Sequence, residues 1–201
     1  IKTNEQFTDY NNINFNKITP FINKYFNLSD NIMLLIDELK KRYNIDYNNI
    51  CSIRYRGNDK YKETNNPTLD DFVKKAKNIK TNNPNIKFLI QTDEKDFLLN
   101  FLSYFPDSIY FKEVPVISKC DICSFLVLTE NKLNDISWFL ASMYIISKTK
   151  HIITTSGNGE LWIALFRGNA NEIYQYLNHK EYIYDKKNYA YEGIKDNYFL
   201  K

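Results

Sequence analysis

The strongest constraint on the fold is an alternation of short apolar strands with amphipathic helices along most of the 201 residues. Strand-like runs occupy residues 49–55, 86–90 and 151–155, and helical periodicity fills the stretches between them. Strands that alternate with helices form a mainly parallel sheet covered by helices on both faces, with right-handed crossovers. We therefore predict an α/β, Rossmann-like domain over residues 21–177.

Capping residues and apolar spacing define the expected helices. Ser29 or Asp30 caps a helix that runs to about residue 42. Thr68, with Asp71 three residues later, forms an acidic variant of the capping box, and the helix it starts ends near residues 82–85. The remaining helices are predicted over residues 95–104, over residues 136–148 with Asp135 as the cap, and over residues 160–166 with Gly168 closing the helix.

Other segments carry weaker patterns. Residues 1–20 are rich in Asn and predict an arm, or the remnant of a structure that lies upstream. Residues 108–114 predict a third strand, and residues 115–134 predict irregular structure or a short strand at 125–128. Residues 178–201 are rich in Tyr and Lys, which suits either a docking tail or a frayed end.

Composition excludes several classes of protein. The net charge is +3, and the basic residues are interspersed with acidic ones, so nucleic acid is not an expected partner. No apolar run approaches the ~20 residues of a membrane span. We expect no membrane span in this chain.

The cysteines indicate a reducing compartment. Their odd number, in a chain large enough to form a core, argues against a disulfide framework and favours the cytoplasm. Because the first residue is Ile, an upstream targeting segment stays open. Cys120 and Cys123 have metal-ligand spacing, but His151 and His179 lie far away in the sequence, so no metal is expected.

The first predicted strand ends in a dense group of charges. Arg54 and Arg56 are two residues apart and would share one face of an extended chain. Gly57 permits the backbone to turn, and Asp59 and Lys60 follow it. A strand end of this kind is typical of an anion site, although Arg56 in a surface salt bridge is an equally simple interpretation.

Two further groups follow predicted strands. Asp93 and Glu94 come after the strand at 86–90, as donor-site candidates or as a helix cap. A turn lies between the last predicted strand and the helix that follows it. The turn has two interpretations: its free backbone N–H groups bind an anion, or it is only a structural turn. Its residues are Ser156, Gly157, Asn158 and Gly159. Ligands bind at the carboxyl ends of parallel strands, so we expect these groups and Arg56 to converge on one crevice.

Common nucleotide and hydrolase motifs are missing from the sequence. Trp162 stands where a dinucleotide fingerprint has its third Gly, and no Gly-x-x-x-x-Gly-Lys-Ser/Thr motif occurs. His151 opens an apolar strand and is interpreted as structural, so no Ser-His-Asp or Cys-His arrangement is favoured.

The ordered motifs resemble those of a known superfamily. The run Arg54-Tyr55-Arg56-Gly57-Asn58-Asp59-Lys60 is similar to the His-x-Arg-Arg/Gly-x-Asp-Lys motif of the fucosyltransferase-like glycosyltransferases. That superfamily holds the α1,6-, α1,2- and protein O-fucosyltransferases. Matching blocks follow in the family's order at residues 88–94 (Thr-Asp-Asp/Glu), at 105–107 (Phe/Tyr-Pro) and at 145–158 with 161–165. The resemblance covers roughly residues 20–170.

The resemblance implies a fold and roles for individual residues. The family has the GT-B fold with two Rossmann-like halves, and this chain resembles the donor-binding C-terminal half. Arg56 falls on the arginine that holds the donor diphosphate, and Asn158 and Gly159 fall where phosphate contacts lie. Lys60 and Glu63 fall in or near the segment that activates the acceptor hydroxyl. The resemblance also implies an inverting transfer without a metal or other cofactor.

The sequence departs from the family pattern at three positions. Arg54 replaces the family's histidine, Gly57 replaces its second arginine as in some bacterial-type members, and Ser142 stands where an aspartate is expected. These positions help to recognise the nucleotide in the family. The resemblance implies GDP as the nucleotide of the donor, and the three changed residues leave this expectation unsecured.

The leading hypothesis from the sequence is a glycosyltransferase donor domain. It would use a nucleotide sugar, expected to be GDP-fucose, and a glycan or other hydroxyl acceptor. An N-terminal half that is absent here, or a second chain, is an expected partner. The alternatives are a non-catalytic module that binds nucleotide sugars or glycans, and an interaction domain on the same scaffold.

Overall fold

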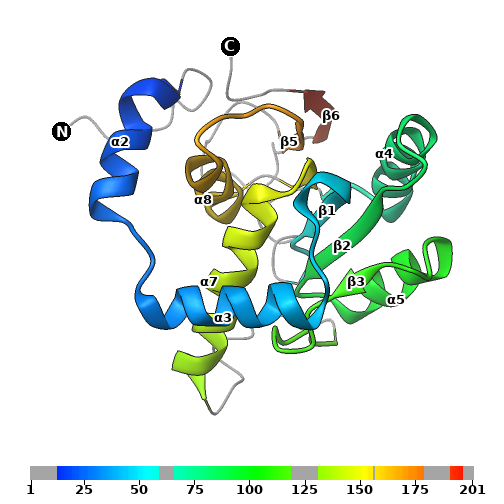
Figure 1. The fold of residues 1–201 in the computed structure, drawn as a ribbon. Helices are drawn as coiled ribbons and strands as arrows, with labels where there is room; N and C mark the ends of the chain where they lie inside the picture. Colours follow the sequence, from blue (N-terminus) through cyan, green and yellow to red (C-terminus); the bar gives the residue numbers. More distant parts are fainter. Residues whose placement is uncertain (1–12, 59–65, 119–130, 156, 179–190, 197–201) are drawn as a thin grey trace.

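The computed structural model describes residues 13–58, 66–118, 131–155, 157–178 and 191–196 (Figure 1). The helices are α2 (Phe15–Tyr25), α3 (Asp30–Arg42), the short 3₁₀ helix η2 (Tyr47–Asn49), α4 (Leu69–Asn82), α5 (Lys95–Tyr104), α7 (Lys132–Lys148) and α8 (Asn158–Arg167). The strands are β1 (Ile50–Tyr55), β2 (Lys87–Thr92), β3 (Ile109–Tyr110), β4 (His151–Thr154), β5 (Ile173–Asn178) and β6 (Tyr191–Asp196).

These strands form one sheet in the order β3-β2-β1-β4-β5-β6. Strands β1 to β5 are parallel to their neighbours, and β6 pairs antiparallel with β5. The chain first builds outward from β1 through β2 to β3, then returns to place β4 on the other side of β1. The predicted Rossmann-like, mainly parallel sheet is confirmed, and its strand order reverses between β1 and β4.

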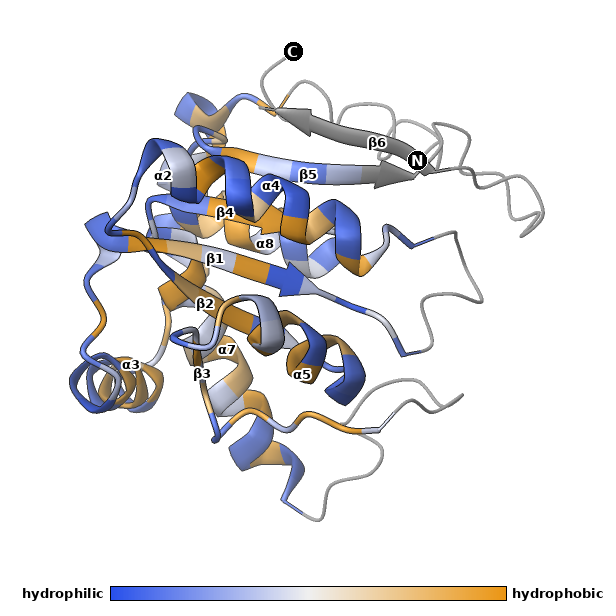
Figure 2. Ribbon diagram, turned by 90° about the vertical axis from the view of Figure 1, so that its right-hand side faces the viewer, coloured by the Kyte–Doolittle hydropathy of each residue, from blue (hydrophilic) through white to orange (hydrophobic). Residues whose placement is uncertain are grey.

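Helices cover both faces of the sheet (Figures 1 and 2). On one face α3, α7 and α8 contribute to an apolar cluster with alternate strand residues, including Ile50, Leu89 and Ile152. On the other face α4 and α5 pack with the strand residues that point the opposite way, including Ile53 and Phe88. Burial on both faces explains why the strands are apolar along most of their length.

Most helix predictions are confirmed together with their caps. Ser29 is the N-cap residue of α3, although its side chain makes no capping hydrogen bond. Thr68 and Asp71 form the complete capping box of α4, and α5 has the predicted bounds. Gly168 ends α8 in the left-handed conformation at φ 77°, where a side chain would be strained.

Two boundaries differ from the prediction. Helix α7 begins at Lys132 rather than near residue 136, because the side chain of Asn131, and not of Asp135, accepts from the backbone of Asn134. The strand predicted over residues 108–114 is reduced to β3. The chain turns directly after it, where the amide of Val114 donates to the carbonyl of Phe111 at 3.2 Å.

Helix α2 is absent from the sequence prediction, which places residues 15–20 in an arm. The side chain of Asn14 caps it by accepting from Lys17 N, and Pro20 lies inside it. Phe15 and Ile22 are buried, and α2 packs against α8. Burial of this face stabilises a helix whose internal proline removes one backbone hydrogen bond.

Strands β5 and β6 are also absent from the prediction. β6 lies within residues 178–201, assigned to a docking tail or a frayed end, and it extends the sheet by pairing with β5. The short strand considered at residues 125–128, and Cys120 and Cys123, lie outside the described residues. Among the helices that are described, none has the length and apolar character needed to cross a membrane.

Candidate functional site

The carboxyl ends of β1, β2 and β4 meet at one edge of the sheet, at the point where the strand order reverses. Register pairs Arg54 of β1 with Gln91 of β2 on one side and with Thr154 of β4 on the other. Gln175 of β5 continues this row beyond Thr154. In a parallel sheet such a reversal leaves a crevice between neighbouring loops, where ligands bind.

The row of Gln91, Arg54, Thr154 and Gln175 is polar and nevertheless buried, with each residue 4% exposed or less. Each side chain also has one polar atom without a hydrogen-bond partner, namely Gln91 Oε1, Arg54 Nε, Thr154 Oγ1 and Gln175 Oε1. Figure 2 shows the change from apolar to hydrophilic along β1. Buried polar atoms without partners are costly, so this layer is a place where water or a ligand is expected.

Within this row, Arg54 faces α7 and α8. The Arg54 guanidinium lies over the ring of Phe139 in α7, 5.6 Å from its centroid. Its Nε atom lies 3.5 Å from Oε1 of Glu160 in α8, and its Nη1 donates to the carbonyl of Tyr55 at 3.1 Å. Arg54 therefore connects the end of β1 to both helices on that face.

The N-terminus of α8 lies beside Arg54. Gly157 is the N-cap residue and has no side chain to satisfy the free amides of the first turn. A Cβ atom on Gly159 would lie 3.8 Å from Arg54 Nη2, so the guanidinium reaches the second residue of the helix. Asn158 is exposed. The loop after β4 and the end of β1 thus come together at Arg54, and the expected convergence of Arg56 on the same turn stays a prediction.

The loops after β1 and β2 are joined by hydrogen bonds. Asp93 Oδ1 accepts from the amide of Gly57 at 2.9 Å, and the Asp93 carbonyl accepts from Asn58 Nδ2 at 2.6 Å. A Cβ on Gly57 would lie 1.9 Å from Oε2 of Glu94 and 2.6 Å from a ring carbon of Tyr55, so a larger residue here would require these side chains to move. The Asp93 carboxylate therefore holds the loop that carries Arg56.

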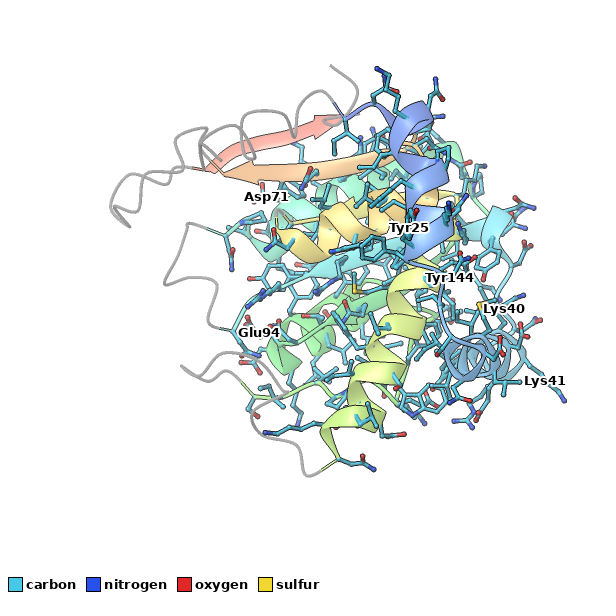
Figure 3. The ribbon with its side chains drawn as sticks, turned by 90° about the vertical axis from the view of Figure 1, so that its left-hand side faces the viewer. Tyr25, Lys40, Lys41, Asp71, Glu94 and Tyr144 are labelled. Atoms are coloured by element: carbon cyan, nitrogen blue, oxygen red, sulfur yellow. The ribbon has the colours of Figure 1, made fainter. Side chains whose placement is uncertain are left out.

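Glu94 and Arg56 lie at the same edge. Glu94 precedes α5 as its N-cap residue without a side-chain capping bond, and Figure 3 shows it on the opposite side of the view from Lys40 and Lys41 of α3. Arg56 is half-buried, and its carbonyl accepts from Asn66 Nδ2 at 3.2 Å. The other predicted site residues, Asp59, Lys60, Glu63 and Ser156, lie outside the described residues.

The structure adds site residues that sequence reasoning missed. The sequence pattern indicates Glu160 only as the start of a helix, whereas its side chain is buried against Arg54. The pattern does not indicate Gln91, Thr154 or Gln175 as site residues. The available signal was a polar residue near the carboxyl end of each of several apolar strands, which is informative only once the strands are aligned.

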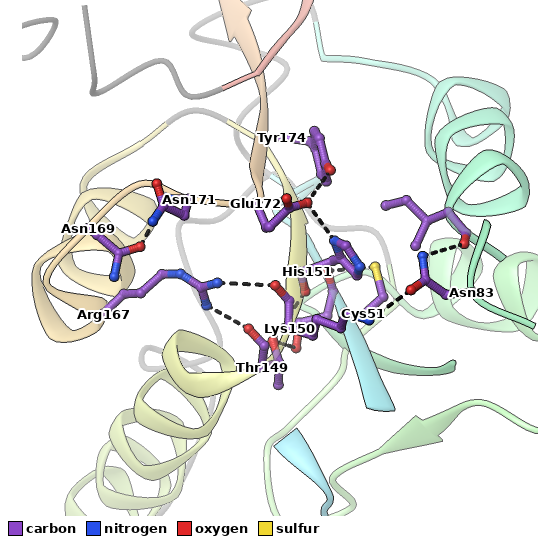
Figure 4. Close-up of polar contacts among 12 residues, drawn as sticks. Cys51, Asn83, Thr149, Lys150, His151, Arg167, Asn169, Asn171, Glu172 and Tyr174 are labelled. Atoms are coloured by element: carbon purple, nitrogen blue, oxygen red, sulfur yellow. Dashed lines mark hydrogen bonds and ion pairs between the residues drawn. The ribbon is translucent and has the colours of Figure 1, made fainter. Parts of the chain in front are cut away.

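A second polar cluster lies at the opposite, amino end of β4 (Figure 4). His151 Nδ1 lies 2.9 Å from Oε2 of Glu172, which also accepts from the hydroxyl of Tyr174. Arg167 Nη1 donates to the carbonyl of Thr149 at 2.6 Å. These contacts tie α8 and β5 to the start of β4, which agrees with a structural role for His151.

Burial and hydrogen bonding shift the pKa values of His151 and Glu172 in this cluster. Burial lowers the pKa of His151 below its ordinary value, and the neighbouring Glu172 carboxylate only partly opposes this effect. The hydrogen bond from Tyr174 is the main cause of a lowered pKa at Glu172. Cys51 is fully buried, and burial raises the pKa of its thiol. Within the described ranges, no three His, Cys, Asp or Glu side chains are grouped as metal ligands.

No protein-family model matches the chain, and no curated protein matches its sequence. The fold is similar to a crystal structure of NodZ alpha-1,6-fucosyltransferase co-crystallized with GDP, at 16% identity over 75% of this chain and 45% of that chain, with a TM-score of 0.48. A NodZ structure soaked with GDP-fucose gives 14% identity over 85% of this chain and 50% of that chain, with a TM-score of 0.47. This chain spans about half the length of those proteins.

Proposed function

We propose that this domain binds a nucleotide sugar at the carboxyl edge of its sheet and takes part in transferring the sugar to a hydroxyl acceptor. One observation carries the proposal: Arg54 is buried at the strand-order reversal, and its Nη2 lies beside Gly159 in the first turn of α8. A cation and free helix amides together suit a phosphate group. The ordered motif resemblance supports a sugar diphosphate, with GDP-fucose as the expected donor.

Arg56 and the first turn of α8 would hold the diphosphate from two sides. An arginine suits this role because its guanidinium is always charged and presents several N–H donors in a fixed plane. The bond network of Gly57, Asn58 and Asp93 fixes the loop on which Arg56 stands. A rigid loop lowers the entropic cost of placing the guanidinium against the ligand.

The chemistry proposed is an inverting transfer without a metal. A general base removes the proton of the acceptor hydroxyl, whose oxygen attacks the anomeric carbon of the donor sugar. The bond from that carbon to the diphosphate oxygen breaks, and the departing diphosphate carries the electron pair. Arg56 would stabilise this negative charge, and Lys60 and Glu63 are the proposed acceptor-side residues. The acceptor would require a second half or a second chain.

A non-catalytic module that binds nucleotide sugars is the second candidate. It is favoured by Arg54 at the position of the family's histidine, together with the Glu160 carboxylate beside it. Both candidates require the same diphosphate site. They differ in whether bound donor is hydrolysed or transferred.

A thermal-shift panel tests the proposal. The free protein is compared with samples containing GDP, UDP, GDP-fucose or GDP-mannose, because a ligand that binds only the folded state raises the melting temperature. We expect stabilisation by GDP and its sugar esters. If no nucleotide stabilises the protein, both candidates are wrong. If GDP-fucose does stabilise the protein, release of fucose from the bound donor separates an enzyme from a binding module.

A further inference from the structure

The α8 end of the candidate site contains a carboxylate where an anionic ligand is expected. Glu160 is 4% exposed, and its Oε1 atom has no hydrogen-bond partner although it lies 3.5 Å from Arg54 Nε. Arg54 Nε likewise has no hydrogen-bond partner. The two groups attract each other across the first turn of α8, but neither is fully satisfied by the other.

The second oxygen of the same carboxylate lies close to the helix N-cap. A Cβ atom on Gly157 would be 2.6 Å from Glu160 Oε2, so the side chain folds back over the N-terminal turn. This places negative charge at the positive end of the α8 dipole. The position is the one that a ligand phosphate would take to reach the same amides.

We propose that Glu160 is a selectivity residue of this site, a built-in carboxylate that competes with ligand phosphate for Arg54 and for the amides of α8. This inference rests on the proposed function. Repulsion from a buried carboxylate grows with the charge of the ligand. A free nucleoside diphosphate carries more negative charge than its sugar ester, so Glu160 disfavours the free diphosphate more strongly. The site would then retain the sugar ester and release the diphosphate product.

A purely structural role for Glu160 predicts something different. A counter-ion for Arg54, or a cap for α8, would stabilise the fold without altering the preference between ligands of different charge. Its removal would lower the melting temperature and weaken all ligands, or leave all of them unchanged. The ratio of two affinities therefore separates the roles.

The test compares wild type with Glu160→Gln, which keeps the side-chain shape and removes the charge. Isothermal titration with GDP, GDP-fucose and inorganic pyrophosphate gives the affinities. Glu38→Gln is the matched control, because Glu38 also pairs with an arginine, Arg42, but on the exposed surface of α3. We expect Glu160→Gln to bind GDP roughly tenfold more tightly than wild type does, and to show a smaller gain in affinity for GDP-fucose. The affinities of Glu38→Gln should equal those of wild type.

Each outcome decides the inference. Equal gains for GDP and GDP-fucose, or no gain, would overturn it even if the nucleotides bind. If Glu160→Gln binds pyrophosphate more tightly than wild type does, and neither protein binds a nucleotide, the result supports competition between Glu160 and the ligand phosphate. The same result contradicts the proposed function. If Glu160→Gln does not fold, the affinities of wild type still test the inference. The inference requires that wild type bind GDP-fucose more tightly than GDP. A wild type that prefers GDP overturns it.

Discussion

The Nε atom of Arg54 lies 3.5 Å from Oε1 of Glu160, and this pair connects the carboxyl end of β1 to the first turn of α8. Both side chains are buried where the strand order reverses. A buried ion pair is costly to form, and removing one partner leaves an uncompensated charge. The chain therefore keeps a paired cation at the edge of the sheet where an anionic ligand is proposed to bind.

Gly159→Ala should separate stability from binding. A Cβ at this position would lie 3.8 Å from both Arg54 Nη2 and the methyl group of Met143, which is ordinary contact. Alanine is the better helix former, so the variant should be more stable by about 0.5–1 kcal/mol in chemical denaturation. The added methyl group would obstruct a phosphate that approaches the helix amides, so GDP affinity should fall. A variant that is stabilised and binds GDP normally would contradict the placement of the anion site.

Asp93→Ala should destabilise the loop after β1. The change removes the acceptor of the buried Gly57 amide, and an unsatisfied buried donor costs about 1–3 kcal/mol. Asp93→Asn is the matched control, since it retains an oxygen at Oδ1 that can accept the same hydrogen bond. Urea denaturation should show a clear loss for the alanine variant and a smaller loss for asparagine. Equal losses would indicate that the Asp93 charge, and not the hydrogen bond, stabilises the loop.

The His151 cluster predicts a pH dependence of stability. Burial lowers the pKa of His151 in the folded protein, so the unfolded chain binds the proton more readily. Its stabilising contribution is therefore present above the unfolded pKa of about 6.5 and is lost as the pH falls through the lower, folded value. The melting temperature should decrease between about pH 7 and pH 5, and His151→Gln should flatten this slope.

The other histidine provides the control for that measurement. The chain contains two histidines, so His179→Gln changes the same residue type at a different position. A larger change of slope between about pH 7 and pH 5 in His151→Gln than in His179→Gln assigns the effect to His151. If His151→Gln has the same slope as wild type, burial does not hold His151 in its neutral form.

Elements with strong local signals were predictable from the sequence. The capping box of Thr68 and Asp71 fixed the start of α4, and apolar periodicity gave α3 and α5 nearly to the residue. Helix α2 was missed because Pro20 usually marks a boundary, whereas burial of Phe15 and Ile22 against the rest of the fold decides here. Local rules do not include such tertiary burial.

The candidate site was predictable only in part. Sequence order and the parallel-sheet rule brought the ends of β1, β2 and β4 together correctly. The pairing of Arg54 with Glu160 joins residues far apart in the chain, and neither residue carries a local pattern that indicates the other. The buried row of Gln91, Arg54, Thr154 and Gln175 likewise appears only through strand register. The roles of Lys60 and Glu63 stay predictions.

Titration of GDP into wild type, Arg56→Ala and Arg42→Ala tests the central claim most directly. Arg42 is a matched control because it lies on α3 and pairs with Glu38 and Glu113. The proposed diphosphate site predicts that wild type and Arg42→Ala bind GDP equally, and that Arg56→Ala loses at least roughly tenfold in affinity. Arg56→Ala binding GDP as tightly as wild type, or no binding by any of the three proteins, would contradict it.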